Sequence, residues 1–203
     1  MQRRGRRRRR RSSNQEFTFR SKRFHINTKA VFREFFNWIL LIFIAGILGY
    51  AVVTFMRQTV TVVGPSMNNT LEDGQVVIVD KLTYKFKDVE RYDIIAFSQV
   101  ENDDYYDIKR VIGLPEETIL IKDGYIYING EKLEDIPFDD KILTAGIAGE
   151  EIVLSEDEYF VMGDNVNNSE DSRYTNVGNI SKTEILGKVY YILKPKDDRG
   201  RIK

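Results

Sequence analysis

The sequence predicts a mainly β protein, in which an antiparallel β-sheet domain is tethered by one N-terminal transmembrane helix. Three observations lead to this prediction. Residues 35–56 form a run of 22 positions without a charged side chain. Beyond that run, short segments rich in β-branched residues recur as far as position 193. Asp-Gly and Asn-Gly dipeptides, which suit tight hairpins, lie between some of these segments.

The first element is a basic tail, which we place at residues 1–34. Residues 1–33 carry 13 basic side chains and one acidic, whereas residues 58–203 carry 17 basic and 29 acidic. Basic residues beside a membrane span stay on the cytoplasmic side, so the tail is expected in the cytoplasm. Such a tail also attracts anionic membrane lipids. These two effects explain the charge, and no nucleic-acid partner is required.

The second element is the charge-free run at 35–56, which we interpret as an uncleaved transmembrane signal anchor. As a helix rising about 1.5 Å per residue it would be roughly 33 Å long, enough for a hydrocarbon core of about 30 Å. A cleaved signal peptide would be shorter and would end in small residues, whereas this run ends in Phe55 and Met56. A buried core helix is disfavoured because no other segment is apolar enough to surround it. The chain is therefore expected in the plasma membrane.

The third element, residues 57–203, is expected to be an extracytoplasmic β-rich domain. Residues 131–149 are less regular and predict an excursion from the sheet. The dipeptides Asp123-Gly124 and Asn129-Gly130 predict two hairpins. The expected strands share β-branched and aromatic residues and lie at 59–64, 75–81, 92–97, 106–114, 117–121, 125–128, 150–154, 158–163 and 185–193.

The composition excludes several kinds of catalytic chemistry. The chain has no cysteine, which excludes disulfides, thiolate catalysis and Cys-ligated metals. Its single histidine, His25, lies in the basic tail. A nucleophile in the domain must therefore use a carboxylate, a tyrosine or a lysine as its base.

Ser66 is the first candidate catalytic residue. It follows Gly64-Pro65 at the end of an expected strand, where a sharp turn would expose its hydroxyl and free nearby backbone N–H groups to bind an oxyanion. The alternative is an ordinary turn serine.

Lys109 is the second candidate, because it lies inside the apolar strand expected at 106–114. Strand alternation places it on one face with Val111, and Arg110 on the other. Burial would favour the neutral amine, which can accept a serine proton. The alternative is a lysine that blunts a solvated sheet edge.

The third candidate feature is the polar loop at 163–173, GDNVNNSEDSR, which follows an apolar strand. Loops of this kind hold sites on rigid sheets. The spacing does not fit a calcium loop, because Val166 takes a ligand position and the required glycine is absent. The alternative is a hydrogen-bonded turn without a function of its own.

Together these features resemble the bacterial type I signal peptidases of the Gram-positive type, which are single-span serine proteases with a Ser-Lys dyad. The resemblance covers most of the chain. Its motifs, in the family's order, are GPSMNNTL (64–71), DGQVVIVDK (73–81), YDIIAF (92–97), KRVIGLP (109–115), YINGEKL (127–133) and GDNVNNSEDSR (163–173).

The resemblance implies roles for the matching residues. Ser66 matches the nucleophile, and its backbone N–H matches a donor of the oxyanion hole. Lys109 matches the general base. Ser169 matches the serine that orients the lysine, and Asp171 with Arg173 matches a structural ion pair.

Three further residues match framework positions of the family. Arg110 follows the lysine, and Asp164 with Asn165 shapes the polar loop. No metal or cofactor is implied.

The implied reaction is acyl transfer, with secretory preproteins and their signal peptides as substrates and cleavage after a small-x-small site such as Ala-x-Ala. Proximity to the translocon is expected. Departures from the family pattern are Asn69 in place of proline, Glu116-Glu117 in place of Gly-Asp, and Gly64 where some members have a second oxyanion donor.

Two alternatives remain at this level. The first is a processing protease with the same dyad and a narrow client set, or a self-cleaving repressor-type relative, which the membrane span disfavours. The second is a non-catalytic membrane-tethered module that binds peptides or cell-wall material.

Overall fold

The computed structural model describes residues 28–98, 105–138 and 140–202. The described chain divides into two units, with the boundary between Ile47 and Leu48. Most of the tail predicted at 1–34, including His25, lies outside the described residues.

Helix α1 (Thr28–Phe55) contains nearly all of the predicted membrane span. Its segment Val31–Phe55 is long and apolar enough to cross a membrane, and no part of it is buried by protein. A buried core helix is therefore wrong. The helix begins at Thr28, before the charge-free run, so residues that we placed in the basic tail form its first turns.

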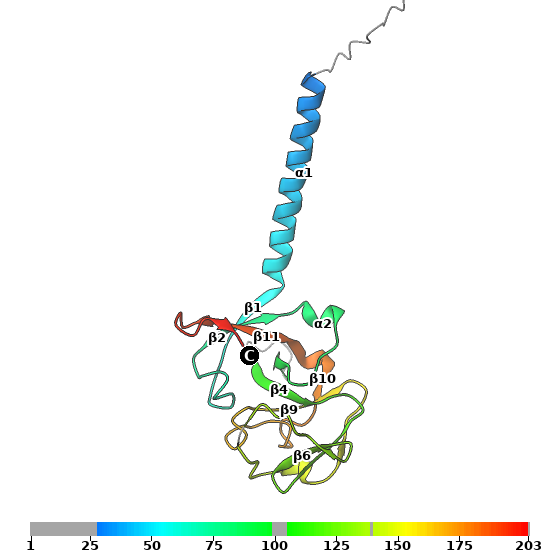
Figure 1. Cartoon of the computed structure of the whole chain (residues 1–203), viewed down its shortest axis with the longest axis vertical. Coiled ribbons are helices and arrows are strands. Elements are labelled where there is room, and N and C mark those ends of the chain that lie inside the picture. Colours follow the sequence, from blue (N-terminus) through cyan, green and yellow to red (C-terminus); the bar gives the residue numbers. More distant parts are fainter. Residues whose placement is uncertain (1–27, 99–104, 139, 203) are drawn as a thin grey trace, which may run out of the picture. The chain divides into compact units, whose positions relative to one another are not determined.

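The larger sheet of the domain is antiparallel and has eight strands (Figure 1). It contains the strands expected at 59–64, 75–81, 92–97, 106–114, 158–163 and 185–193. The order across this sheet is β1 (Arg57–Thr61), β2 (Val76–Asp80), β11 (Ile185–Lys194), β3 (Ile94–Phe97), β4 (Asp107–Gly113), β9 (Glu158–Met162) and β10 (Ile180–Ser181), with β12 (Gly200–Arg201) paired to β11.

The smaller sheet contains the two predicted hairpins. Its order is β7 (Glu131–Lys132), β6 (Tyr125–Ile128), β5 (Thr118–Lys122) and β8 (Ile152–Val153). Both turns have positive φ at each central residue, 54° and 80° at Asp123-Gly124 and 51° and 83° at Asn129-Gly130. This is the type I′ geometry that matches the twist of paired strands.

Short helical segments complete the domain: α2 (Thr83–Phe86), η1 (Gly146–Gly149) and η2 (Lys182–Glu184). Within the excursion predicted at 131–149, strand β7 and helix η1 are regular. Between them the described residues 133–138 and 140–145 form neither helix nor strand.

Strand β4 lies at the centre of the hydrophobic core. Ile108 packs with the residues of β1, β2 and β3, Val111 packs with those of β3 and β9, and Ile112 packs between the two sheets. The core thus fixes β4 at several points along its length. Lys109 and Arg110 lie in the middle of this strand.

Candidate active site

Ser66 lies in a sharp turn that follows β1. Gly64 has φ of +83°, a conformation open to glycine without strain, and its N–H donates to Asp73 Oδ1 at 2.8 Å. Met67 and Leu71 are fully buried and anchor the turn to the core. The local fold therefore holds the Ser66 backbone in place.

The polar loop holds the same turn from the other side. The backbone N–H of Asn165 donates to Ser66 O at 3.0 Å, and its side-chain amide donates to Pro65 O at 3.0 Å. The loop at 163–173 is therefore part of the serine's support, and the interpretation of it as a turn without a function of its own is not favoured.

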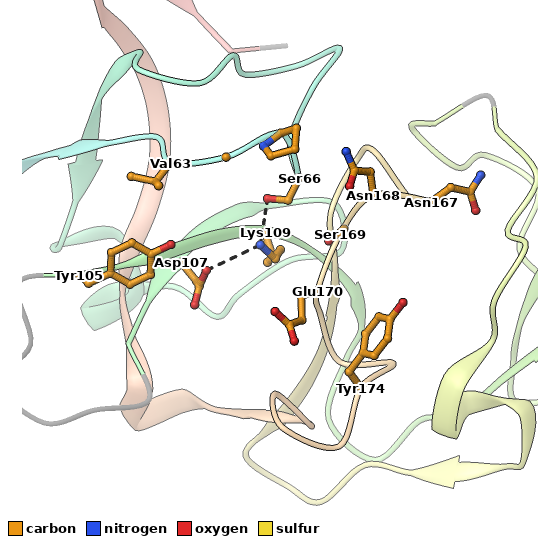
Figure 2. Close-up of a pocket in the computed structure, with 12 residues that line it drawn as sticks. Val63, Ser66, Tyr105, Asp107, Lys109, Asn167, Asn168, Ser169, Glu170 and Tyr174 are labelled. Carbon is orange, nitrogen blue, oxygen red and sulfur yellow. Dashed lines mark hydrogen bonds and ion pairs between the residues drawn. The ribbon is translucent and has the colours of Figure 1, made fainter.

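Lys109 points from β4 toward this serine (Figure 2). Its Nζ atom lies 3.0 Å from Ser66 Oγ. The residue is 4% exposed, and β4 pairs with β3 on one side and β9 on the other. The alternative of a lysine on a solvated edge is therefore wrong.

Two opposing effects act on the pKa of Lys109. Burial lowers it, and nearby carboxylates act in the opposite direction, chiefly Asp107 at 3.8 Å and then Asp171 and Glu170. Burial is the larger effect, so the pKa lies below the ordinary value for lysine. The fraction of neutral amine is raised accordingly.

Ser169 lines the cavity into which Ser66 and Lys109 open, and 8% of its surface is exposed. Its Oγ atom is buried and makes no hydrogen bond to the residues that the structure describes. The hydrogen bond to Lys109 that the resemblance implies is thus not formed in this structure, and that role stays a prediction.

Gly163 explains how Ser169 and Ser66 come so close together. A Cβ atom on Gly163 would lie 2.3 Å from Ser169 Oγ and 2.4 Å from Ser66 O. Both distances are far below van der Waals contact. A glycine is therefore required between the two serines, a role that sequence reasoning did not assign.

Asp171 and Arg173 form a buried ion pair. Arg173 Nε donates to Asp171 Oδ1 at 2.8 Å, and the two side chains are 1% and 0% exposed. Arg173 also donates to the carbonyl groups of Thr144 and Val166. The pair ties the polar loop to the excursion that precedes it.

Arg110 and Asp164 form a second buried pair on the opposite face of β4. The guanidinium donates to both carboxylate oxygens, at 2.7 and 2.6 Å, in the bidentate geometry that gives strong, directional pairs. Thr70 donates a hydrogen bond to the same carboxylate. Thr70, which the sequence did not single out, thus links the serine turn to β4.

The serine and the lysine open into a cavity of about 480 Å³. Asp107 could have been found from the sequence, because it lies two positions before Lys109 and therefore on the same strand face. The other lining residues Glu170, Tyr105 and Tyr174 have no sequence pattern that would have placed them in the cavity. The lining residues are Val63, Gly64, Pro65, Ser66, Tyr105, Asp107, Lys109, Asn167, Asn168, Ser169, Glu170 and Tyr174. Among the described residues, no three His, Cys, Asp or Glu side chains gather as metal ligands would.

A serine hydroxyl beside a buried lysine amine, in an open cavity on a β-sheet, is the arrangement of a serine hydrolase that uses lysine as its base. Comparison with known proteins identifies the family. The family described as "Signal peptidase, peptidase S26" matches residues 35–193. The chain belongs to this family of signal peptidases and is a serine endopeptidase. The resemblance predicted from the motifs is confirmed, and an enzyme is favoured over a binding module.

Two relatives from Bacillus and Staphylococcus support this assignment. Signal peptidase I of Bacillus licheniformis is 33% identical over 79% of this chain and 89% of its own. Signal peptidase IB of Staphylococcus aureus is 31% identical over 80% of this chain and 91% of its own. A solved signal peptidase I from Enterococcus faecalis V583 is 30% identical, covers 50% of this chain and 97% of its own, and has a TM-score of 0.41.

Proposed function

We propose that Ser66 and Lys109 are the nucleophile and general base with which this type I signal peptidase cleaves signal peptides from secretory preproteins. The observation that carries the proposal is the 3.0 Å distance between Lys109 Nζ and Ser66 Oγ inside a buried environment. The ammonium form would donate to Oγ. The neutral amine, which burial favours, would instead accept the serine proton.

The reaction proceeds in two stages. Lys109 takes the proton of Ser66 as Oγ attacks the scissile carbonyl carbon, and it then gives that proton to the leaving amine when the C–N bond breaks. In the second stage Lys109 takes a proton from water, whose oxygen attacks the acyl carbon. The proton returns to Ser66 Oγ as the ester bond breaks.

The developing oxyanion needs a fixed donor, and we assign this role to the backbone N–H of Ser66. This N–H makes no hydrogen bond to any residue that the structure describes. The hydrogen bonds from Asn165 to the Ser66 and Pro65 carbonyl groups orient the backbone on which it lies. A donor held in place before the reaction needs no reorganisation during it.

The remaining site residues act as supports. We assign Ser169 to the orientation of Lys109 and the two buried ion pairs, Arg110 with Asp164 and Arg173 with Asp171, to the framework. The first pair joins the polar loop to β4. The second lies within the loop, and Arg173 also donates to the carbonyl group of Thr144.

We further propose cleavage after small-x-small sites such as Ala-x-Ala. The support for this specificity is the family to which the chain belongs. The test is a series of preproteins in which the alanine before the cut is replaced by a bulky residue. Loss of cleavage with the bulky residue is expected, and undiminished cleavage would contradict this specificity.

The chain is membrane-anchored, and we propose the orientation and boundaries. Residues 1–34 are the cytoplasmic tail, 35–56 the span, and 57–203 the extracytoplasmic domain. The basic tail supports this orientation and an attraction to anionic lipids. Proximity to the translocon follows from the substrate. Protease added outside intact cells should reach the domain, whereas protection of the domain would contradict the orientation.

A further inference from the structure

A cluster of lysines lies where the chain leaves its apolar helix. Helix α1 ends at Phe55 and β1 begins at Arg57. The backbone N–H of Lys81 donates to Met56 O at 3.1 Å. Because Met56 is the last residue of the charge-free run, Lys81 lies within one hydrogen bond of the end of the span. This is the depth of lipid headgroups.

A cavity of about 410 Å³ opens at this point, and we call it the juxtamembrane pocket. It combines three lysines with apolar side chains and has no acidic lining residue. Its lining residues, all in the second unit of the chain, are Phe55, Met56, Lys81, Tyr84, Lys85, Val89, Lys182, Ile185 and Leu186. Residues 58–203 carry 29 acidic and 17 basic side chains, so this concentration of lysines opposes the charge of the domain.

Two acidic groups beside the pocket, Asp80 and Asp88, are already engaged, and neither is paired with Lys81 or Lys85. The carboxylate of Asp80 accepts hydrogen bonds from Leu82 N and Thr83 Oγ1, at 2.8 and 3.1 Å. Asp88 pairs with the third lysine of the pocket, Lys182, at 3.0 Å, so that lysine is not counted as a ligand. Lys81 and Lys85 make no side-chain hydrogen bond or ion pair with any residue in the described part of the chain. Two positive charges in the pocket are therefore available to an anion.

An exposed aromatic side chain stands beside these charges. Phe86 is 83% exposed at the end of α2, between the exposed Lys85 and Lys87. Exposure of a phenyl ring to water is unfavourable, whereas the ring is stable in a membrane interface next to lysines that reach the headgroups. The combination of aromatic and basic residues is typical of surfaces that lie on anionic bilayers.

We propose that the juxtamembrane pocket binds the phosphate group of anionic lipid headgroups, with Lys81 and Lys85 as its ligands and Phe86 in the interface. The inference rests on the anchoring of the chain in a membrane and is independent of the dyad. Binding of this kind holds the domain against the bilayer surface on which it acts.

The test uses the full chain in nanodiscs, with a Phe86→Cys variant carrying an environment-sensitive fluorophore. The natural chain has no cysteine, so the label reports one position. Nanodiscs of phosphatidylcholine alone are compared with discs in which about a third of the lipid is phosphatidylglycerol. The emission of the fluorophore is expected to be shifted to shorter wavelength in the anionic discs, compared with the neutral ones. The shift should decrease at high salt, because salt screens charges at a surface.

A pair of variants tests the lysines. Lys81→Gln with Lys85→Gln should weaken docking roughly 30-fold, as the loss of two lysines near an anionic surface predicts. The matched control is Lys122→Gln with Lys196→Gln, which removes two exposed lysines from the smaller sheet and the segment after β11. The control should dock as the parent does.

The proposal would be overturned by an equal blue shift in neutral discs, by no shift in either kind of disc, or by an equal effect of the two lysine pairs. A shift produced by free inorganic phosphate in neutral discs would show a soluble-anion site and would also overturn it. A failure of the dyad is detected in a separate assay, the cleavage of a soluble peptide. This reaction does not depend on docking, so the Lys81→Gln, Lys85→Gln variant can be assayed in the same way.

Discussion

The Nζ atom of Lys109 lies 3.0 Å from the Oγ atom of Ser66, although 43 positions separate the two residues in the chain. One comes from a turn after β1 and the other from the middle of β4. The hydrophobic core packs around β4, and the polar loop hydrogen-bonds to the turn, so the fold itself brings the two groups together. This distance underlies the first two predictions below.

The value of kcat/KM should rise with pH as Lys109 loses its proton, and the midpoint of this rise should lie below the ordinary pKa of lysine. Burial lowers this pKa, and Asp107 partly opposes the change. Asp107→Asn removes a group that favours the ammonium form, so it should move the rising limb to lower pH. The measurement is kcat/KM over pH with a short peptide, because this ratio reports the free enzyme.

Asp88→Asn is the control for that profile, since Asp88 pairs with Lys182 outside the cavity. Its rising limb should coincide with that of the parent. A limb in the Asp107→Asn variant at higher pH than in the parent would contradict the assigned effect of the carboxylate.

Replacement of Lys109 by methionine should abolish cleavage without lowering stability at neutral pH. Because the folded-state pKa lies below that of the unfolded chain, the unfolded chain binds more protons between the two values. The parent should therefore gain stability as pH rises through that window, and the variant should not. Thermal unfolding at several pH values measures both. A large loss of stability at pH 7 would show that the charged lysine holds the fold together.

Much of the fold follows from the sequence. The β-branched runs gave the main strands, and the two glycine dipeptides gave both hairpins, because these signals are local. The short strands β10 and β12 were missed because each has two residues and forms only when its neighbour is already in place. The first turns of α1 were missed because charged residues are tolerated in a helix.

The candidate site was predictable where the chemistry depends on residue type. Without histidine or cysteine in the domain, Ser66 and Lys109 stood out. The role of Gly163 was not predictable, because it depends on how closely two serines far apart in sequence approach each other. Burial of Lys109 was equally open, because the order of strands around β4 decides it.

Gly163→Ala should destabilise the site. The added methyl group would lie 2.3 Å from Ser169 Oγ and 2.4 Å from a backbone oxygen, which must shift. Overpacking of this kind costs about 1–3 kcal/mol. We expect lower thermal stability and a large loss of kcat, measured on the same preparation.

Gly149→Ala is the matched control, because its nearest atom is Ala145 Cβ at 3.6 Å, an ordinary contact. It should retain both stability and activity. Equal behaviour of the two alanine variants would show that the spacing between Ser66 and Ser169 is not tight.

Arg173→Met should be strongly destabilising. It leaves the carboxylate of Asp171 buried and unpaired, and loss of one partner of a buried pair costs about 3–5 kcal/mol. Chemical denaturation measures the free energy of unfolding. Lys182→Met, which breaks the exposed pair with Asp88, should change it little. Similar losses in the two variants would contradict the importance of burial.

The central measurement is cleavage of a preprotein with an Ala-x-Ala site by the full chain, with mass spectrometry to locate the cut. The parent, Ser66→Ala and Lys109→Met are compared after each is confirmed to be folded. The dyad predicts a single cut after the second alanine in the parent and a rate lower by about 10³-fold or more in each variant. Cleavage at the same site and rate by either variant would contradict the account.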